Sequence, residues 1–211
     1  MKTLLISGSP TKDGSTEILL DAVAGGIKES LNKKLSPEEV KDSVFDLIRL
    51  NELKFIPCQS CGESPEPKFC FFDDDLSDVY VKLVECDIVV MGTPIFFDSV
   101  SGQMKMFIDR CSCFRPPDFE GTTSHMFKKL GLTRRAGGAV LVAGERGRFD
   151  LAQSVLKGFF KWTEIDAHGF VLYESPDFRA KGLANENTPA LEDAKALGKT
   201  LVDKALGEEG R

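Results

Sequence analysis

The sequence predicts an α/β fold in which helices cover both faces of a five-stranded parallel sheet. Short apolar runs alternate with longer amphipathic segments along the 211 residues. This alternation is typical of parallel strands that are joined by crossover helices. The apolar runs have about four to eight residues, which is the usual length of a buried strand. The expected strands are residues 3–7, 44–50, 87–92, 139–143 and 169–173.

A helical period of apolar residues separates or follows these strands. The expected helices are residues 16–31, 76–85, 101–111, 151–163 and 189–206. Five strand–helix units favour the strand order 2-1-3-4-5 of the flavodoxin-like three-layer sandwich over a six-stranded dinucleotide-binding fold. We expect a single domain, residues 1–211, because a chain of this length more readily forms one well-buried core than two. Long loops at 51–75 and 112–138 are more often functional or interfacial than idle.

Composition and charge exclude several classes of function. The net charge of −6 and the pI near 5.1 argue against nucleic acid as a partner. No stretch of about 18 apolar residues is present, so we expect no membrane span. The N-terminus enters a strand directly, so we expect no signal peptide. Six cysteines without an export signal are then reduced thiols or metal ligands in the cytoplasm.

The loop after the first expected strand is rich in hydroxyl groups. It lies at the N-terminus of a helix, where free N–H groups and the helix dipole favour an anion. The loop matches neither the dinucleotide motif G-x-G-x-x-G nor G-x-x-x-x-G-K-[ST]. Hydroxyl donors without an obligatory lysine suit the terminal phosphate of a mononucleotide such as FMN. The alternative is an ordinary capped helix. The candidate phosphate-binding residues are Ser9, Thr11, Ser15 and Thr16.

Two further loops are expected beside the first, because ligands bind at the carboxyl ends of the strands where the strand order reverses. The loop after the third strand combines a stiff proline with an apolar, aromatic surface that suits a flat ring. The loop after the fourth strand has glycines that permit close backbone approach. The alternative is that the phenylalanines are core residues and the glycines are turns. The candidates are Thr93, Pro94, Ile95, Phe96 and Phe97, followed by Gly144, Glu145, Arg146 and Gly147.

Two motifs resemble the NADPH-dependent FMN reductases, and more narrowly the iron–sulfur flavoprotein branch of that family. They are Gly8-Ser9-Pro10-x-x-x-Gly14-Ser15-Thr16 and the stretch 93–110, which starts Thr93-Pro94-Ile95-Phe96-Phe97. The resemblance implies FMN at the three loops, reduction of the flavin by NAD(P)H, and a homodimer or homotetramer. It assigns the phosphate to the four hydroxyl residues. It assigns the isoalloxazine to Pro94–Phe97 on one side and Gly144–Gly147 on the other.

The cysteine loop resembles the four-cysteine cluster motif of iron–sulfur flavoproteins but departs from it. Cys58-x-x-Cys61 and Cys70 match three positions, while the third position of the motif falls on Ser64. Serine is a poor substitute for a thiolate, so a 4Fe-4S cluster is not favoured. The first alternative is a zinc site completed by Cys111 or Cys113. The second is a loop of reduced thiols that packs against a neighbouring subunit. The apolar side chains of this loop and of the segment Phe114–Phe119 lie outside the expected layers and need cover, so we expect a symmetric partner subunit.

The other polar residues that stand out in the sequence are expected to have structural roles and not catalytic ones. His125 and His168 have no Ser, Cys or Asp at a diagnostic spacing, and a flavin needs no protein nucleophile, so no catalytic side chain is predicted. Asp74 or Asp75 is expected to cap a helix rather than to bind a metal. The basic group near residue 134 is expected to be a solvated face, with a nicotinamide phosphate as the alternative. Its members are Lys128, Lys129, Arg134 and Arg135.

Taken together, the residues and the resemblance predict an FMN-dependent NAD(P)H oxidoreductase. Electrons would pass from nicotinamide through the flavin to a quinone, a free flavin, a metal complex or a redox protein. Two alternatives stay open at this point. One is an iron–sulfur flavoprotein, and the other is a flavodoxin-type electron carrier without NAD(P)H activity of its own.

Overall fold

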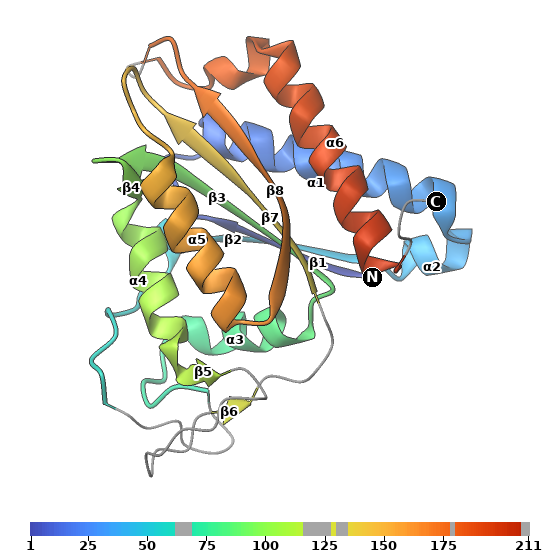
Figure 1. Ribbon diagram of the computed structural model, residues 1–211. Helices are drawn as coiled ribbons and strands as arrows, with labels where there is room; N and C mark the ends of the chain where they lie inside the picture. Colours follow the sequence, from blue (N-terminus) through green and yellow to red (C-terminus); the bar gives the residue numbers. More distant parts are fainter. Residues whose placement is uncertain (62–68, 116–127, 130–134, 178–179, 208–211) are drawn as a thin grey trace.

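The central sheet of the molecule contains five parallel strands in the order β2-β1-β3-β7-β8 (Figure 1). The computed structural model describes residues 1–61, 69–115, 128–129, 135–177 and 180–207. The parallel strands are β1 (Lys2–Ser7), β2 (Val44–Arg49), β3 (Ile88–Phe96), β7 (Arg135–Ala143) and β8 (Ile165–Glu174). Counted along the chain, these strands have the order 2-1-3-4-5, so the predicted sheet is confirmed.

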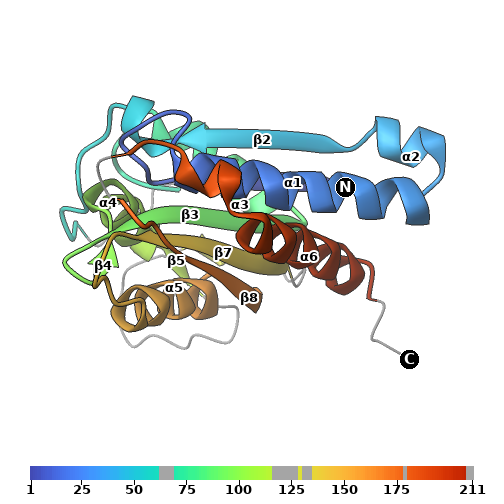
Figure 2. The ribbon, with the colours of Figure 1, turned by 90° about the horizontal axis from the view of Figure 1, so that it is seen from above.

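Helices form a layer on each face of this sheet (Figures 1 and 2). The helices α1 (Ser15–Lys34) and α6 (Thr188–Ala205) lie side by side on one face. The other face is covered by α3 (Leu76–Glu85), α4 (Gly102–Arg110) and α5 (Asp150–Trp162). The shorter elements are α2 (Pro37–Lys41), β4 (Ser99–Val100), β5 (Phe114–Arg115), β6 (Lys128–Lys129), η1 (Leu50–Glu52), η2 (Cys111–Cys113) and η3 (Leu183–Glu186). No helix of the described residues is long and apolar enough to cross a membrane.

The two layers have separate apolar cores because side chains alternate between the faces of a strand. On β1, Leu5 packs with α1 and α6, while Leu4 and Ile6 face the layer of α3, α4 and α5. Since both faces are covered, the strands read as continuous apolar runs, which is why the sequence revealed them.

Two strands begin earlier than the sequence predicts. β7 starts at Arg135 rather than at residue 139, and β8 starts at Ile165 rather than at residue 169. The missed part of β7 contains Gly137 and Gly138, which an apolar pattern does not identify as strand. A Cβ atom on Gly137 would lie 2.3 Å from Cγ2 of Ile165, so packing against β8 demands glycine there. The loop expected at 112–138 is therefore shorter, because residues 135–138 belong to β7.

β3 also runs further than expected, through Phe96. Residues Thr93 to Phe96 were expected in a loop, yet they continue the strand. Pro94 lies opposite Val142 of β7 in the parallel ladder. Ile95 and Phe96 then pair with β4 in an antiparallel hairpin. This extension carries the aromatic segment beyond the body of the sheet.

Arg135 is buried at the start of β7, so the expectation of a solvated basic face is wrong for this residue. Its guanidinium group donates hydrogen bonds to the carbonyl oxygens of Leu83 and Thr163. Burial lowers the pKa of Arg135. The carbonyl acceptors link the C-terminal ends of α3 and α5 to the sheet. Arg134 lies outside the described residues.

Glycines allow α1 and α6 to pack in close contact. A Cβ atom on Gly26 would lie 2.1 Å from the carbonyl oxygen of Lys195, and one on Gly198 would lie 2.2 Å from that of Val23. Any side chain at either position would push the helices apart. The neighbouring Gly25 is exposed, and an added Cβ would meet nothing within 4 Å.

Alanine at these two adjacent glycines should therefore have opposite effects. Gly25→Ala should raise the free energy of unfolding by about 0.5–1 kcal/mol, because alanine loses less backbone entropy in a helix. Gly26→Ala should lower it by about 1–3 kcal/mol through overpacking. Urea denaturation of both variants measures the difference. Equal effects of the two substitutions would contradict the close α1–α6 contact.

Candidate functional site

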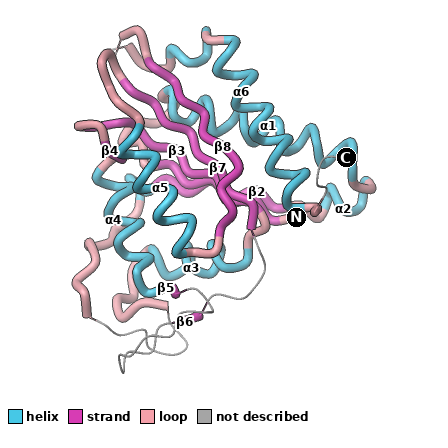
Figure 3. Tube along the Cα trace, in the orientation of Figure 1, coloured by secondary structure: helices cyan, strands magenta, loops and turns pink. Residues whose placement is uncertain are grey.

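A cavity of about 650 Å³ lies at the carboxyl edge of the sheet. The loops after β1, β7 and β8 and the turn between β3 and β4 form its walls, and Figure 3 shows the segments after β7 and β8 at the same edge as that turn. All predicted cofactor-binding residues except Thr93 line this cavity. They are Ser9, Thr11, Ser15, Thr16, Pro94, Ile95, Phe96, Phe97, Gly144, Glu145, Arg146 and Gly147. Their convergence is a structural finding, while their part in binding stays a prediction.

The first loop brings hydroxyl groups to an uncapped helix. The Ser9 hydroxyl donates to the carbonyl oxygen of Thr11 at 3.0 Å, and the Thr11 N–H donates back to it at 3.3 Å. α1 begins at Ser15, and no side chain of the described residues caps it at Gly14. The alternative of an ordinary side-chain cap is therefore wrong. The positive end of α1 faces the cavity instead.

A buried carboxylate under this loop was not predicted from the sequence. Glu17 accepts a hydrogen bond from Nε of Arg49 at 2.9 Å and one from the backbone N–H of Asp13 at 3.2 Å. The Glu17 hydrogen bond raises the pKa of the Arg49 guanidinium. The pair ties the end of β2 to the loop, and Asp13 has a positive φ of 53° there. The sequence signal that could have revealed this carboxylate is Glu17 itself, a charged residue on the apolar face of α1.

Thr93 is buried and is not one of the residues that line the cavity. Its side-chain oxygen Oγ1 accepts a hydrogen bond from the N–H of Ser101 at 3.0 Å and donates to the carbonyl oxygen of Pro94 at 2.8 Å. The Ser101 hydroxyl donates to the carbonyl oxygen of Gly8 at 2.7 Å and accepts from the N–H of Met104 at 3.2 Å. Thr93 and Ser101 thus hold the first two loops together from below.

The turn between β3 and β4 points the aromatic residues outward. Ile95 is buried, Phe96 is half exposed and Phe97 is fully exposed. The alternative that these phenylalanines belong to the core is therefore wrong. Asp98, which the sequence analysis missed, also lines the cavity. Its Oδ1 accepts a hydrogen bond from the N–H of Arg148 at 3.0 Å and so joins this turn to the loop after β7.

The loop after β7 is a tight turn that depends on glycine. The N–H of Gly147 donates to the carbonyl oxygen of Gly144 at 3.0 Å. A Cβ atom on Gly147 would lie 2.7 Å from Cβ of Ala143. Arg146 has a positive φ of 65°, and its N–H donates to the Glu174 carboxylate at 3.3 Å.

A fourth wall of the cavity comes from the segment between β8 and α6. Ser175, Ala180, Lys181 and Gly182 line it. The N–H of Ala184 donates to the Ser15 hydroxyl at 3.2 Å, so this segment packs on the start of α1. This segment was not predicted from the sequence, because no hydroxyl-rich or glycine-rich motif marks it.

The cysteine loop does not form a metal site in the described part of the chain. No three Cys, His, Asp or Glu side chains there converge around a point that could hold a metal ion. Cys58 is half buried, Cys61 is exposed and Cys70 is buried. The N–H of Ser60 donates to the sulfur of Cys58 at 3.4 Å. Ser64, the third position of the motif, lies outside the described residues.

An ion pair between Asp74 and Arg110 holds this loop against the fold. Asp74 accepts a hydrogen bond from the Leu76 N–H at 3.2 Å, while the N-cap residue of α3, Asp75, makes no side-chain cap. Asp74 also binds both terminal nitrogens of Arg110, at 2.7 and 3.2 Å. Arg110 is 1% exposed and donates a further bond to the carbonyl oxygen of Ile56 at 2.8 Å. His168 lies on β8 away from the cavity, and His125 lies outside the described residues.

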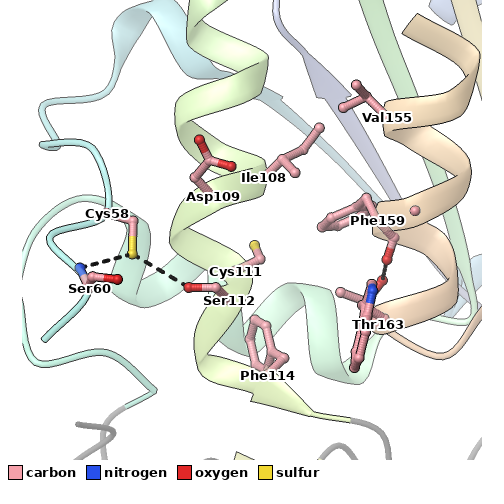
Figure 4. A pocket seen from close by; sticks show the side chains of 12 residues that line it. Cys58, Ser60, Ile108, Asp109, Cys111, Ser112, Phe114, Val155, Phe159 and Thr163 are labelled. Atoms are coloured by element: carbon pink, nitrogen blue, oxygen red, sulfur yellow. Dashed lines mark hydrogen bonds between the residues drawn. The ribbon is translucent and has the colours of Figure 1, made fainter. Parts of the chain in front are cut away.

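A second cavity, of about 660 Å³, lies between the C-terminal ends of α4 and α5 (Figure 4). Cys58 faces it from the cysteine loop, with its sulfur 3.5 Å from the hydroxyl oxygen of Ser112. Phe114 forms part of the wall and is itself buried, with its ring 5.3 Å from that of Phe69. Its expected need for cover by a partner is therefore wrong. Phe119 lies outside the described residues.

A doubly wound fold serves many functions, so comparison with known proteins decides the family. Residues 1–172 match the model of the NADPH-dependent FMN reductases. The chain belongs to this family. The predicted resemblance is confirmed, and FMN is the cofactor that the family's name specifies.

Relatives of similar length agree with this assignment. An iron–sulfur flavoprotein of Methanocaldococcus jannaschii is 27% identical and aligns over 96% of each chain. An iron–sulfur flavoprotein of Archaeoglobus fulgidus is 28% identical over 97% of this chain and 96% of its own. A solved archaeal flavodoxin superposes with a TM-score of 0.53 at 14% identity, covering 98% of this chain and 99% of its own. That likeness shows the flavodoxin-like fold.

The six thiols should react with Ellman's reagent in two classes. Cys58 and Cys61 should react rapidly in the native protein, because Cys61 is exposed and Cys58 is only half buried. Cys70, Cys86, Cys111 and Cys113 are buried and should react slowly. Burial also raises the pKa of Cys86 and Cys113 to about 12 and that of Cys111 well above its usual value, so these three groups have almost no reactive thiolate below pH 9. Mass spectrometry of the labelled peptides identifies the fast class. Rapid native labelling of Cys86 would contradict this packing.

Proposed function

We propose that the protein is an FMN-dependent oxidoreductase that oxidises NAD(P)H and reduces a diffusible acceptor. The observation that carries the proposal is one cavity that joins an uncapped helix N-terminus to an apolar, aromatic wall. These two surfaces suit the two ends of FMN, a phosphate and a flat conjugated ring. The acceptor classes considered are a quinone, a free flavin, a metal complex and a redox protein. The free cysteines are consistent with a reducing cytoplasm.

The phosphate of FMN would occupy the first loop. Gly14, Ser15 and Thr16 bring the N-terminus of α1 to this corner, and an anion is stabilised there by the helix dipole. The hydroxyls of Thr11, Ser15 and Thr16 supply donors beside it, while the Ser9 hydroxyl donates to the carbonyl oxygen of Thr11 and so shapes the loop. Lys12 is paired with Glu52 at 2.5 Å and is not required for this site.

The isoalloxazine would lie between the hairpin of β3 and β4 and the loop after β7. Pro94, Ile95 and Phe96 present backbone and apolar side chains from one side, and Gly144 and Gly147 present bare backbone from the other. The sequence also assigned Phe97 to this ring, but its side chain is fully exposed at the tip of the hairpin, so we leave it out of the isoalloxazine contact. When bound, FMN supplies the hydride acceptance and the electron transfer. The protein orients the ring, shields it from water and leaves one edge open for a second reactant.

The cysteine loop supports a second candidate function, that of an iron–sulfur flavoprotein. The names of the two relatives favour it, as do Cys58, Cys61 and Cys70. The described cysteines do not converge, and one motif position holds serine. We therefore propose that electrons stay on the flavin. A flavodoxin-type carrier would share the site but would not oxidise NAD(P)H.

We also propose that the protein is a homo-oligomer, with α5 in the interface. Leu151, Val155, Gly158 and Trp162 form one stripe along this helix. Leu151 is 59% exposed and Trp162 is 48% exposed, so the stripe is an apolar surface facing solvent. Ile108 of α4 extends it across the second cavity. An apolar surface of this kind is stabilised by burial against a symmetric partner.

An absorption spectrum with metal analysis tests the proposed cofactor and the absence of a cluster. Anaerobically purified protein should show flavin as its only strong chromophore, bleach on addition of NADPH or NADH, and contain at most sub-stoichiometric iron and zinc. Broad absorption near 400 nm with about four irons per chain would overturn the proposed absence of a cluster. A flavin that neither nucleotide reduces would favour the electron carrier.

Removal of two hydroxyls from the first loop should weaken FMN binding. Ser9→Ala with Thr16→Ala should cost roughly 2–4 kcal/mol, because Thr16 loses a hydrogen bond to a charged group and Ser9 loses the two bonds that hold Thr11 in place. Fluorescence titration of FMN measures this loss. The matched control is Ser154→Ala with Thr200→Ala, which removes two hydroxyls that bond only to their own helices. Equal FMN affinity in both double variants would reject the phosphate assignment.

Sedimentation at micromolar concentration tests the interface. The wild-type protein should be a dimer or tetramer of the 23.2 kDa chain. Leu151→Asp should shift it to the monomer, because a carboxylate in an apolar interface is left without hydration. Lys157→Asp, on another side of α5, should leave the assembly unchanged. A wild-type protein that sediments only as a monomer would count decisively against the proposal.

A further inference from the structure

Phe97 is an apolar side chain that the fold leaves uncovered beside the candidate site. Its exposure is 102% of the reference value, the highest of the large apolar side chains in the described part of the chain. It also lines the cavity of about 650 Å³. Phe96, just before it, is half exposed, so the aromatic surface grows more open toward the tip of the hairpin.

The backbone at this position is unfavourable for phenylalanine. Phe96 pairs with Ser99, so Phe97 and Asp98 are the two central residues of a hairpin turn. Both have positive φ, 49° and 60°, as a type I′ turn requires. Asn-Gly is the preferred pair in such turns, while a bulky residue with positive φ is strained. The chain thus places an aromatic ring where stability alone would select asparagine.

The surrounding contacts hold the turn in this conformation. Asp98 accepts the N–H of Arg148, and β4 pairs with the end of β3. Six non-glycine residues of the described chain have positive φ, and three of them line the cavity: Phe97, Asp98 and Arg146. Strain that is concentrated at one cavity and fixed by its neighbours is typical of a functional site.

We propose that Phe97 is the binding face for the second planar conjugated ring that reacts at this site. That ring is either the nicotinamide of the electron donor or the ring of a quinonoid acceptor. The inference rests on the proposed function, because it assigns the partner of a flavin. Phe97 extends past Ile95 and Phe96, which form the wall for the isoalloxazine, and reaches the rim by which a second ring enters. Stacking of aromatic faces stabilises such a ring without a charge or a hydrogen bond.

Three variants of the FMN-saturated protein test the proposal. Phe97→Asn removes the ring and relieves the positive-φ strain, and Phe97→Trp keeps an aromatic face. Phe71→Asn is the matched control, because Phe71 is 54% exposed but does not line the cavity. For each variant, measure urea unfolding, FMN affinity and sedimentation. Then measure KM and kcat for NADPH with ferricyanide, which has no conjugated ring, and for 1,4-benzoquinone at saturating NADPH.

Phe97→Asn should raise the urea midpoint and leave FMN affinity and sedimentation unchanged. It should raise the KM of one of the two substrates, NADPH or benzoquinone, by about five- to tenfold with little change in kcat. A higher KM for NADPH with ferricyanide identifies the ring as nicotinamide, and a higher KM for benzoquinone alone identifies it as the acceptor. Phe97→Trp should keep the wild-type KM, and Phe71→Asn should change neither KM.

Four results would overturn the assignment. Unchanged KM values for both substrates would show that no ring stacks on Phe97. A loss of FMN affinity as large as the change in KM would show that Phe97 binds the flavin itself. An altered sedimentation coefficient would place it in a subunit interface. Failure of Phe97→Trp to keep the KM would exclude aromatic stacking. Wild-type protein that binds no FMN would instead reject the proposed function.

Discussion

The Ser101 side chain ties the candidate site together from beneath. Its hydroxyl donates to the carbonyl oxygen of Gly8 and accepts from the N–H of Met104, while its backbone N–H donates to Thr93. A hydroxyl can serve as donor and acceptor at once, so one buried residue joins the loop after β1, the end of β3 and the start of α4. A Cβ atom on Gly8 would lie 2.8 Å from Cβ of Met104, so the contact also depends on glycine.

Contacts across the cavity extend that constraint to the other loops. Asp98 holds the loop after β7 through Arg148, and Ser15 holds the segment after β8 through Ala184. Each link uses a side chain of one loop and a backbone group of another. The walls are therefore fixed before any ligand binds, which lowers the ordering cost of binding. The same rigidity retains the left-handed backbone at Phe97 and Asp98.

The opposite end of α4 holds the cysteine loop by a different means. Arg110 is buried, and its charge is balanced by Asp74 and by the carbonyl oxygen of Ile56. Removal of either partner would leave a buried charge without compensation, so the clamp is a strong constraint on both ends of the loop. Cys70 is packed into the core beside this clamp, while Cys61 is exposed.

The sequence by itself determined the sheet order, the layers and the three loops that supply most of the cavity's lining, because these follow from local signals. Apolar runs, hydroxyls after β1 and glycines after β7 mark their own segments. Only the tertiary structure decided that Arg135 and Phe114 are buried, that Thr93 supports the site from below and that Ser175 and Lys181 complete its wall. The burial and contacts of a side chain depend on residues that the crossover connections bring beside it. A local pattern does not contain those partners.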